Sequence, residues 1–157
     1  MGYTLAAAAK ALSSKRAQFV CAELTATIEK WNRTHLAHLN PGLLDDERIT
    51  VKIQPVQKLI RQASGDYHAI LLDVDNGPSA FHGKKNNNLY TLQGLREIQH
   101  ALKGGGLLAV WSARPDKAFT KTLGKAGFDV SENVVAAAHK GAKRRNHTIW
   151  LARKKTY

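Results

Sequence analysis

Short apolar runs alternate along this chain with segments whose apolar residues recur every three or four positions. The runs cover residues 17–24, 68–74, 107–111, 128–135 and 147–152, and apolar residues alternate with polar ones over residues 49–53. Runs of this length indicate strands, and the segments between them indicate helices, such as one continuous helix over residues 24–39. Strands that alternate with helices predict an α/β fold whose mostly parallel sheet has helices on both faces.

The last two runs differ from the others because a basic loop, and no helical segment, joins them. We therefore expect residues 128–135 and 147–152 to form an antiparallel hairpin at one edge of the sheet. The 157 residues suffice for one domain with a sizeable core and are too few for two comfortable ones. The prediction is a single domain, residues 1–157, with about six strands in its sheet.

Several classes of protein are disfavoured by composition. No apolar run approaches the roughly 20 residues that a membrane span requires, and the first residues do not have the pattern of a secretion signal. A lone Cys21 cannot form an internal disulfide or a cysteine-based zinc site. His35 and His38 share one helix face, but such a pair more often serves packing than metal binding. We expect a cytoplasmic protein that needs no metal.

The charge of the chain is uneven. Lysine and arginine total 24 against 12 acids, which gives a formal net charge of +12. No acid follows Glu132, whereas seven cations do: Lys140, Lys143, Arg144, Arg145, Arg153, Lys154 and Lys155. A basic surface attracts nucleic acid and other polyanions. A solvated basic face without a specific partner is the alternative, because no aromatic cluster for base stacking stands nearby.

Three segments, taken in order, resemble the spermidine synthases. Tyr67-His-Ala-Ile-Leu-Leu-Asp-Val-Asp-Asn-Gly-Pro78 is similar to the strand and loop at their active site. Gly105-Gly-Leu-Leu-Ala-Val-Trp-Ser112 is similar to their next strand, and Arg145-Asn-His-Thr-Ile-Trp-Leu-Ala152 to their last. The resemblance covers essentially the whole chain. It implies the three-layer, Rossmann-like fold that this family shares with class I S-adenosylmethionine-dependent methyltransferases.

The resemblance also implies a ligand and a reaction. Spermidine synthases transfer an aminopropyl group from decarboxylated S-adenosylmethionine to an amine, so a nucleotide-type ligand of this class is expected, whether S-adenosylmethionine, its decarboxylated form or methylthioadenosine. Glu23 matches the acid that binds the ribose, since a carboxylate can accept from two vicinal hydroxyls. Gly2 matches the end of the family's glycine-rich turn, where backbone amides approach the cofactor.

Four further positions carry over to the site. Asp73 matches the acid that ends the fourth strand, which lies by the cofactor and helps to deprotonate the attacking amine. Asn76 stands where the family usually has a second catalytic Asp, and Asp75 and Tyr90 are candidates for substrate binding. Each has a plainer alternative: helix capping or a loop hydrogen bond for Glu23 and Asp73, turn chemistry for the Asp75-Asn76 pair, and a core position for Tyr90.

Two departures from the family bear on function. The chain lacks the family's first strand and most of its glycine-rich turn, and Gln54-Pro55 stands where the third strand commonly ends in Gly-Asp. Without the central strand, 17–24 and 68–74 must pair directly or a partner chain must fill the space, which predicts a homo-oligomer. Two functions remain open: a transferase with Asp73 as base, or an inactive truncated remnant that acts as a basic nucleic-acid- or protein-binding module.

Overall fold

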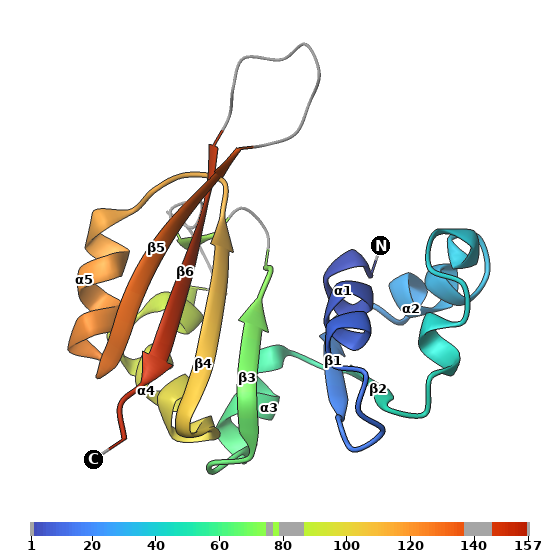
Figure 1. Ribbon diagram of the computed structural model, residues 1–157, viewed down its shortest axis with the longest axis horizontal. Coiled ribbons are helices and arrows are strands. Elements are labelled where there is room, and N and C mark those ends of the chain that lie inside the picture. Colours follow the sequence, from blue (N-terminus) through green and yellow to red (C-terminus); the bar gives the residue numbers. More distant parts are fainter. Residues whose placement is uncertain (1, 75–76, 79–86, 137–145, 157) are drawn as a thin grey trace. The chain divides into compact units, whose positions relative to one another are not determined.

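The computed structural model describes residues 2–74, 77–78, 87–136 and 146–156 of the chain. Helices and strands alternate in it as an α/β fold requires (Figure 1). Two compact units make up the chain, Met1–Leu59 and Ile60–Tyr157. Because two compact units can belong to one domain, the expectation of a single domain stays a prediction.

The N-terminal unit contains a parallel pair of strands. Its elements are α1 (Tyr3–Ala11), β1 (Phe19–Glu23), α2 (Ala26–Arg33), η1 (Ala37–Leu39), η2 (Leu43–Asp45) and β2 (Ile49–Ile53). The register of β1 against β2 runs from Phe19 opposite Ile49 to Glu23 opposite Ile53. Burial is shallow, because Val20 of β1 is 44% exposed and Ala9 is the one described residue of this unit that is buried. The strand expected from residues 17–24 is therefore only partly buried in this unit.

The expected helix over 24–39 is wrong in length. Helix α2 ends at Arg33, and a separate 3₁₀ turn, η1, follows. The cause is local, since the Thr34 hydroxyl donates to the carbonyl of Lys30 at 2.9 Å and the Leu36 amide donates to the carbonyl of Trp31 at 2.8 Å. The Leu36 amide bonds to the carbonyl five residues earlier, whereas an α-helix bonds to the carbonyl four residues earlier, so the α-helix ends there.

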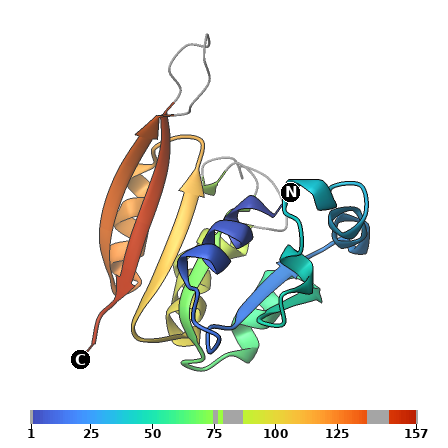
Figure 2. The ribbon, with the colours of Figure 1, turned by 45° about the vertical axis from the view of Figure 1, so that its right-hand side comes forward.

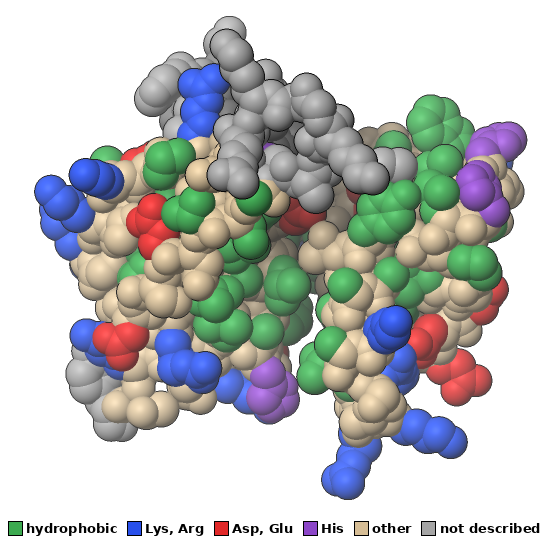
Figure 3. All heavy atoms as spheres, turned by 45° about the horizontal axis from the view of Figure 1, so that its top comes forward, with side chains coloured by type: hydrophobic (Ala, Val, Ile, Leu, Met, Phe, Trp, Pro, Cys, Tyr) green, Lys and Arg blue, Asp and Glu red, His purple; other side chains and the backbone are tan. Residues whose placement is uncertain are grey.

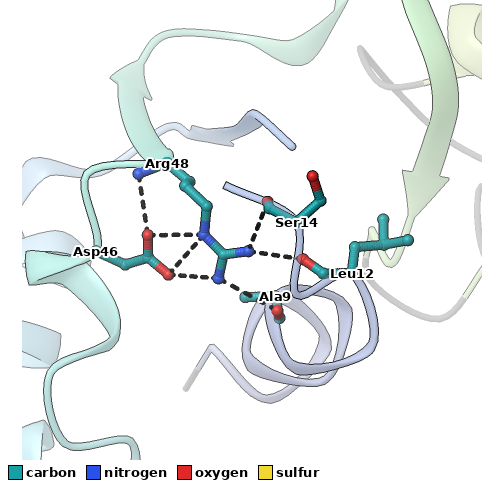
Figure 4. Close-up of polar contacts among 5 residues, drawn as sticks. All are labelled: Ala9, Leu12, Ser14, Asp46 and Arg48. Carbon is teal, nitrogen blue, oxygen red and sulfur yellow. Dashed lines mark hydrogen bonds and ion pairs between the residues drawn. The ribbon is translucent and has the colours of Figure 1, made fainter. Parts of the chain in front are cut away.

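The side chain of Arg48 connects two segments of the N-terminal unit that are distant in sequence (Figure 4). Its Nε and Nη2 donate to the two oxygens of Asp46, the shortest contact being 2.7 Å. Its Nη1 and Nη2 also donate to the carbonyls of Leu12 at 2.6 Å, Ser14 at 3.3 Å and Ala9 at 3.3 Å. These carbonyls lie at and beyond the C-terminal end of α1, where a cation is favoured by the helix dipole. The guanidinium therefore fastens the end of α1 to the start of β2.

The C-terminal unit holds a mixed sheet of four strands. Its elements, after α3 (Val56–Gln62), which spans the boundary, are β3 (Tyr67–Leu72), η4 (Asn87–Tyr90), α4 (Leu92–Ala101), β4 (Leu102–Ser112), α5 (Lys117–Lys125), β5 (Phe128–Ala136) and β6 (Asn146–Lys154). The strand order is β3-β4-β6-β5, with β3 parallel to β4 and β6 antiparallel to both of its neighbours. The predicted antiparallel hairpin of the last two strands is confirmed, and β5 forms the edge.

The core of the C-terminal unit lies between the sheet and its helices α4 and α5, which pack on one face (Figures 1 and 2). The fully buried side chains of this layer include Leu95, Ile98, Leu102, Leu108, Val110, Leu123 and Trp150. The ring of Phe119 contacts those of Tyr90 and Trp150 edge to face, with centroids 5.6 and 5.0 Å apart. The indole Nε1 of Trp150 donates to the hydroxyl of Thr120 at 2.8 Å, so the one polar atom of this large side chain is satisfied.

One sheet of six mostly parallel strands is not confirmed. Six strands are present among the described residues, but β1 and β2 form one sheet and the other four form a second. Direct pairing of β1 with β3, one of the two outcomes expected from the missing first strand, does not occur in this part of the chain, because each has its single neighbour in its own sheet. The other outcome, a partner chain and a homo-oligomer, stays a prediction.

Candidate functional site

Glu23 is the last residue of β1, and its carboxylate is partly engaged. The backbone amide of Thr25, the N-cap residue of α2, donates to Glu23 Oε1 at 3.1 Å. This bond is the loop contact that the sequence left open as the plainer alternative for Glu23. A carboxylate has about four acceptor sites, so one bond to the backbone orients the group and leaves capacity for the hydroxyls of a ligand.

Gly2 stands at the N-terminus of α1. Its backbone is left-handed, with φ 72°, and a Cβ at this position would lie 3.3 Å from Cδ2 of Leu43. Its carbonyl accepts from the amide of Ala6 at 2.9 Å and so begins the helix. Glycine is the residue that adopts this conformation without strain, which agrees with the expected end of a turn that leads into a helix.

Asp73 follows β3 directly and is exposed. The parallel register pairs Leu71 with Ala109 and Leu72 with Val110. Continued by one residue, it sets Asp73 beside Trp111 of β4. Because successive side chains of a strand alternate between the two faces, Asp73 belongs to the face of Leu71, opposite the face that α4 and α5 cover.

The loop after Asp73 is held against the end of β4. Gly77 is buried, has φ 85°, and a Cβ on it would lie 2.5 Å from Cβ and Oγ of Ser112 and 2.7 Å from its Cα. The Gly77 amide donates to the carbonyl of Val74 at 3.4 Å, which closes a turn. Only glycine permits so close an approach, so the loop that leaves the carboxyl end of β3 returns onto the carboxyl end of β4.

The other predicted site residues have different outcomes. Asp75 and Asn76 lie outside the described residues. Tyr90 is buried, with 7% of its surface exposed, and packs on Phe119. That position agrees with the core alternative for Tyr90, and its role in substrate binding stays a prediction. Glu23 and Gly2 belong to the N-terminal unit, whereas Asp73 and Gly77 belong to the C-terminal unit.

An aromatic pair beside Asp73 was not predicted from the sequence. The rings of Trp111 and His147 lie with centroids 5.0 Å apart and planes inclined by 43°. Both side chains are half-buried, and Nδ1 of His147 is buried without a hydrogen-bond partner among the described residues. A signal was available in the sequence, since Trp111 ends an apolar run at the same edge of a parallel sheet as Asp73.

The sequence of the chain matches a known protein family over most of its length. Residues 15–148 match the family described as S-adenosyl-L-methionine-dependent methyltransferase. The chain belongs to this family. The match includes Glu23, Asp73 and Trp111, and it spans both compact units. No curated protein matches the chain in sequence.

Solved structures support the same fold for this family member. The spermidine synthase from Thermotoga maritima has a TM-score of 0.62 and 15% identity, over 87% of this chain and 44% of that one. The precorrin-6y C5,15-methyltransferase from Geobacter metallireducens has a TM-score of 0.67 and 14% identity, over 98% of this chain and 75% of that one. The chain thus spans less than half the length of the spermidine synthase. At such identities, the likeness shows the methyltransferase fold and no specific substrate.

The basic C-terminal region of this methyltransferase-family chain is partly described. Lys140, Lys143, Arg144 and Arg145 lie outside the described residues. Lys154 Nζ donates to the carbonyls of Gln99 and Leu102 at 2.7 Å, Arg153 Nη1 donates to that of Gly105 at 2.9 Å, and Lys155 lies 3.4 Å from the carboxylate of Asp129. These three cations have protein partners, and nucleic-acid binding by the region stays a prediction.

Metal ligands and membrane-spanning helices are both absent from the described residues. These residues contain no group of three His, Cys, Asp or Glu side chains placed to hold a metal ion. Among their helices, none is both long enough and apolar enough to span a membrane. His35 and His38, the pair with suggestive spacing, belong to no metal-binding group in this part of the chain.

Proposed function

We propose that this chain binds a ligand of the S-adenosylmethionine type through Glu23 and transfers a carbon group from it to an amine, with Asp73 as the base. The observation that carries the proposal is the carboxylate of Glu23, at the carboxyl end of β1 and within the residues that match the methyltransferase family. Asp73, within the same match, directly follows β3 in an exposed position that an incoming amine can reach.

The residues present fit such a ligand. Thr25 orients the Glu23 carboxylate through one hydrogen bond of 3.1 Å, and the remaining acceptor sites suit two vicinal ribose hydroxyls. A carboxylate that accepts from hydroxyls forms charge-assisted bonds, which are stronger than neutral ones. Gly2 supplies a left-handed turn at a helix N-terminus, the backbone setting in which amides can approach a polar ligand.

The chemistry requires few groups from the protein. When bound, S-adenosylmethionine or its decarboxylated form supplies a sulfonium-activated carbon, to which the amine nitrogen forms a C–N bond as the C–S bond breaks and its electron pair remains on sulfur. Asp73 holds the incoming amine in its ammonium form, since opposite charges attract at short range. Before the attack, Asp73 accepts one proton from this ammonium, which leaves a neutral amine whose lone pair forms the C–N bond. The product nitrogen then carries the positive charge that the sulfonium loses. We infer no further step from the described residues.

Calorimetric titration in low salt tests the binding part of this proposal. S-adenosylmethionine, its decarboxylated form and methylthioadenosine are titrated into the wild-type chain, Glu23→Ala and Glu47→Ala. Glu47→Ala is the matched control, because it removes the same charge from an exposed residue of the same unit. A hydrogen bond to a charged group contributes about 1.5–3 kcal/mol, so Glu23→Ala weakens binding about 10- to 150-fold. Glu47→Ala binds as the wild type does.

The nature of the transferred group is tested separately. Incubation with each sulfonium ligand and a panel of amines, followed by mass spectrometry, detects either S-adenosylhomocysteine from methyl transfer or methylthioadenosine from aminopropyl transfer. We propose the aminopropyl product on the strength of the resemblance around Asp73. Removal of a general base costs about 10²–10⁴ in rate, so Asp73→Asn slows transfer by that factor. Absence of binding of all three ligands to the wild type contradicts the proposed function.

A further inference from the structure

The four-stranded sheet of the C-terminal unit has one face that its helices α4 and α5 leave uncovered. Side chains that alternate with the buried ones form this open face: Ala69, Leu71, Leu107, Ala109, Trp111, Ile149 and Leu151. Leu71 is 51% exposed. Hydrophobic side chains gather on the near side of this unit in Figure 3. A patch of this kind on a mostly covered sheet is typical of a binding surface.

The open face carries polar and aromatic side chains at the carboxyl edge of β3 and β4. There the register, extended by one residue past its last pair Leu72–Val110, sets Asp73 beside Trp111. Trp111 pairs with Ile149 of β6. The diagonal neighbour of Trp111 on β6 is His147, whose ring contacts the indole at 5.0 Å. A carboxylate, an indole and an imidazole therefore share one edge of the same face, with apolar side chains below them.

One nitrogen of the His147 ring lacks a hydrogen-bond partner in the described part of the chain. Its Nδ1 is buried without a hydrogen-bond partner among the described residues, and a buried nitrogen in that state costs about 1–3 kcal/mol in proteins generally. Unsatisfied buried groups are few in native structures, so this nitrogen is a position where a polar ligand group gains a hydrogen bond.

Charge distinguishes between two kinds of acceptor. A flexible polyammonium acceptor is repelled at long range by a chain with a formal net charge of +12, because that field acts before any local contact forms. Among the described residues, Trp111 and His147 offer π-faces beside the carboxylate of Asp73. Stacking of a flat ring on an aromatic side chain needs no charge on the ligand and contributes substantially to binding.

We propose that Trp111 and His147 form a platform for the acceptor, and that the acceptor is a flat aromatic or heteroaromatic ring that carries the reacting amine. The ring stacks on Trp111, and its amine points to Asp73. This inference rests on the proposed function in one respect, since it takes Asp73 as the group that receives the proton. It goes beyond it by naming the class of acceptor.

Two matched probes test the platform. Benzylamine and cyclohexylmethylamine have the same charge and nearly the same size, and only the first has an aromatic ring. Each is titrated into ¹⁵N-labelled protein, and the indole N–H signals of Trp31, Trp111 and Trp150 are followed by NMR. Benzylamine shifts the Trp111 signal and binds about tenfold more tightly than its saturated counterpart, as expected for one stacking contact. The fully buried Trp150 reports whether the fold is intact.

Variants of Trp111 and His147 separate ring stacking from nonspecific hydrophobic binding. Trp111→Leu keeps an apolar side chain and abolishes the preference for benzylamine, whereas Trp111→Phe keeps part of it. His147→Ala removes one wall of the platform and weakens benzylamine binding with a smaller effect on cyclohexylmethylamine. If Trp111→Leu fails to fold, as loss of the dispersed Trp150 signal would show, Trp111→Phe and His147→Ala still provide the comparison.

Failure of this inference is distinguishable from failure of the proposed function. Equal affinity of the wild type for the two probes, or a benzylamine titration that leaves the Trp111 signal in place, overturns the platform. Calorimetry with S-adenosylmethionine on the same samples reports the proposed function independently. Wild-type protein that binds S-adenosylmethionine through Glu23 but shows no preference for benzylamine retains the proposed function and loses the aromatic acceptor.

Discussion

Gly77 approaches Ser112 so closely that a Cβ on the glycine would lie 2.5 Å from the serine Cβ. The contact joins the loop after β3 to the carboxyl end of β4, the two strands that carry Asp73 and Trp111. The Ser112 hydroxyl is itself held, since it donates to the carbonyl of Arg114 at 2.8 Å. The position of the candidate base thus depends on a glycine four residues away.

Gly77→Ala is expected to destabilise the protein by about 1–3 kcal/mol, the typical cost of overpacking. A left-handed φ of 85° adds to this cost for any residue other than glycine. Gly124→Ala is the matched control, because Gly124 lies inside α5, is exposed and has nothing within 4 Å of its Cβ position. That change should stabilise by about 0.5–1 kcal/mol. Urea denaturation measures both, and equal effects contradict the proposed contact.

Thr120→Val is expected to cost about 1–3 kcal/mol, because it leaves the buried indole N–H of Trp150 without its acceptor. The side chain keeps its shape, so the loss is that of the hydroxyl's hydrogen bonds. These are the 2.8 Å bond that it accepts from the indole and its donation to the Asp116 carbonyl at 3.2 Å or to the Glu132 carboxylate at 3.1 Å. Thr122→Val on the same helix removes a hydroxyl that bonds to the carbonyl of Ala118 at an exposed position. Its effect on the free energy of unfolding should stay within about 0.5 kcal/mol. Thermal unfolding of the two variants, measured side by side, compares their losses of stability.

The N-terminal unit should lose stability in acid through Asp46. Hydrogen bonds from the Arg48 side chain, and then from its backbone, lower the pKa of Asp46 from 3.8 to about 2. A carboxyl whose folded pKa is depressed contributes stability above its unfolded pKa and loses it as pH falls through the folded value. The midpoint of thermal unfolding should therefore decline between about pH 4 and about pH 2.

Asp46→Asn should flatten this decline. Asp45→Asn is the neighbouring control, because the Asp45 side chain is 85% exposed and lies 3.8 Å from Arg33. An unchanged acid profile in Asp46→Asn would show that Arg48 does not hold this carboxylate in solution.

Cys21 should react faster with iodoacetamide when Glu23 is neutral. Burial raises the pKa of the Cys21 thiol, and the charge of Glu23, two residues along β1 on the same face, raises this pKa further. Glu23→Gln removes the second cause, so more thiolate is present at pH 8 and alkylation accelerates. Cys21 is the one cysteine of the chain, which makes intact-mass spectrometry specific. Glu47→Gln should leave the rate unchanged, and a slower rate in Glu23→Gln would refute the arrangement.

Several features of the fold could be predicted because they depend on neighbours in sequence. The alternating apolar pattern of residues 49–53 predicted β2 with its observed bounds, and the run 128–135 with 147–152 predicted the hairpin of β5 and β6. Asp73 and Glu23 were placed at strand ends by the resemblance to the spermidine synthases. The apolar runs alone placed both acids inside strands, at residues 68–74 and 17–24.

Other features depended on competing local bonds that a period does not reveal. The helix over 24–39 was wrong because the Thr34 hydroxyl and the Leu36 amide take carbonyls that a longer α-helix would need. Strand β4 begins at Leu102 and runs through Gly104–Gly106, so it starts earlier than the expected run 107–111. The register shift between Tyr67 and Ala69 absorbs these glycines as an irregularity of the β3–β4 pair, so that the strand continues where the residues favour a break.

By itself, the sequence determined the order of the strands and most helices, since these follow from the spacing of nearby side chains, and its resemblance to the spermidine synthases singled out the candidate acids Glu23 and Asp73. Only the tertiary structure decided that β1 and β3 belong to separate sheets, that Gly77 packs on Ser112, and that Trp111 meets His147. These are contacts between residues distant in the chain. They depend on which backbone groups find hydrogen-bond partners and which side chains fill the remaining space, and no local period encodes that choice.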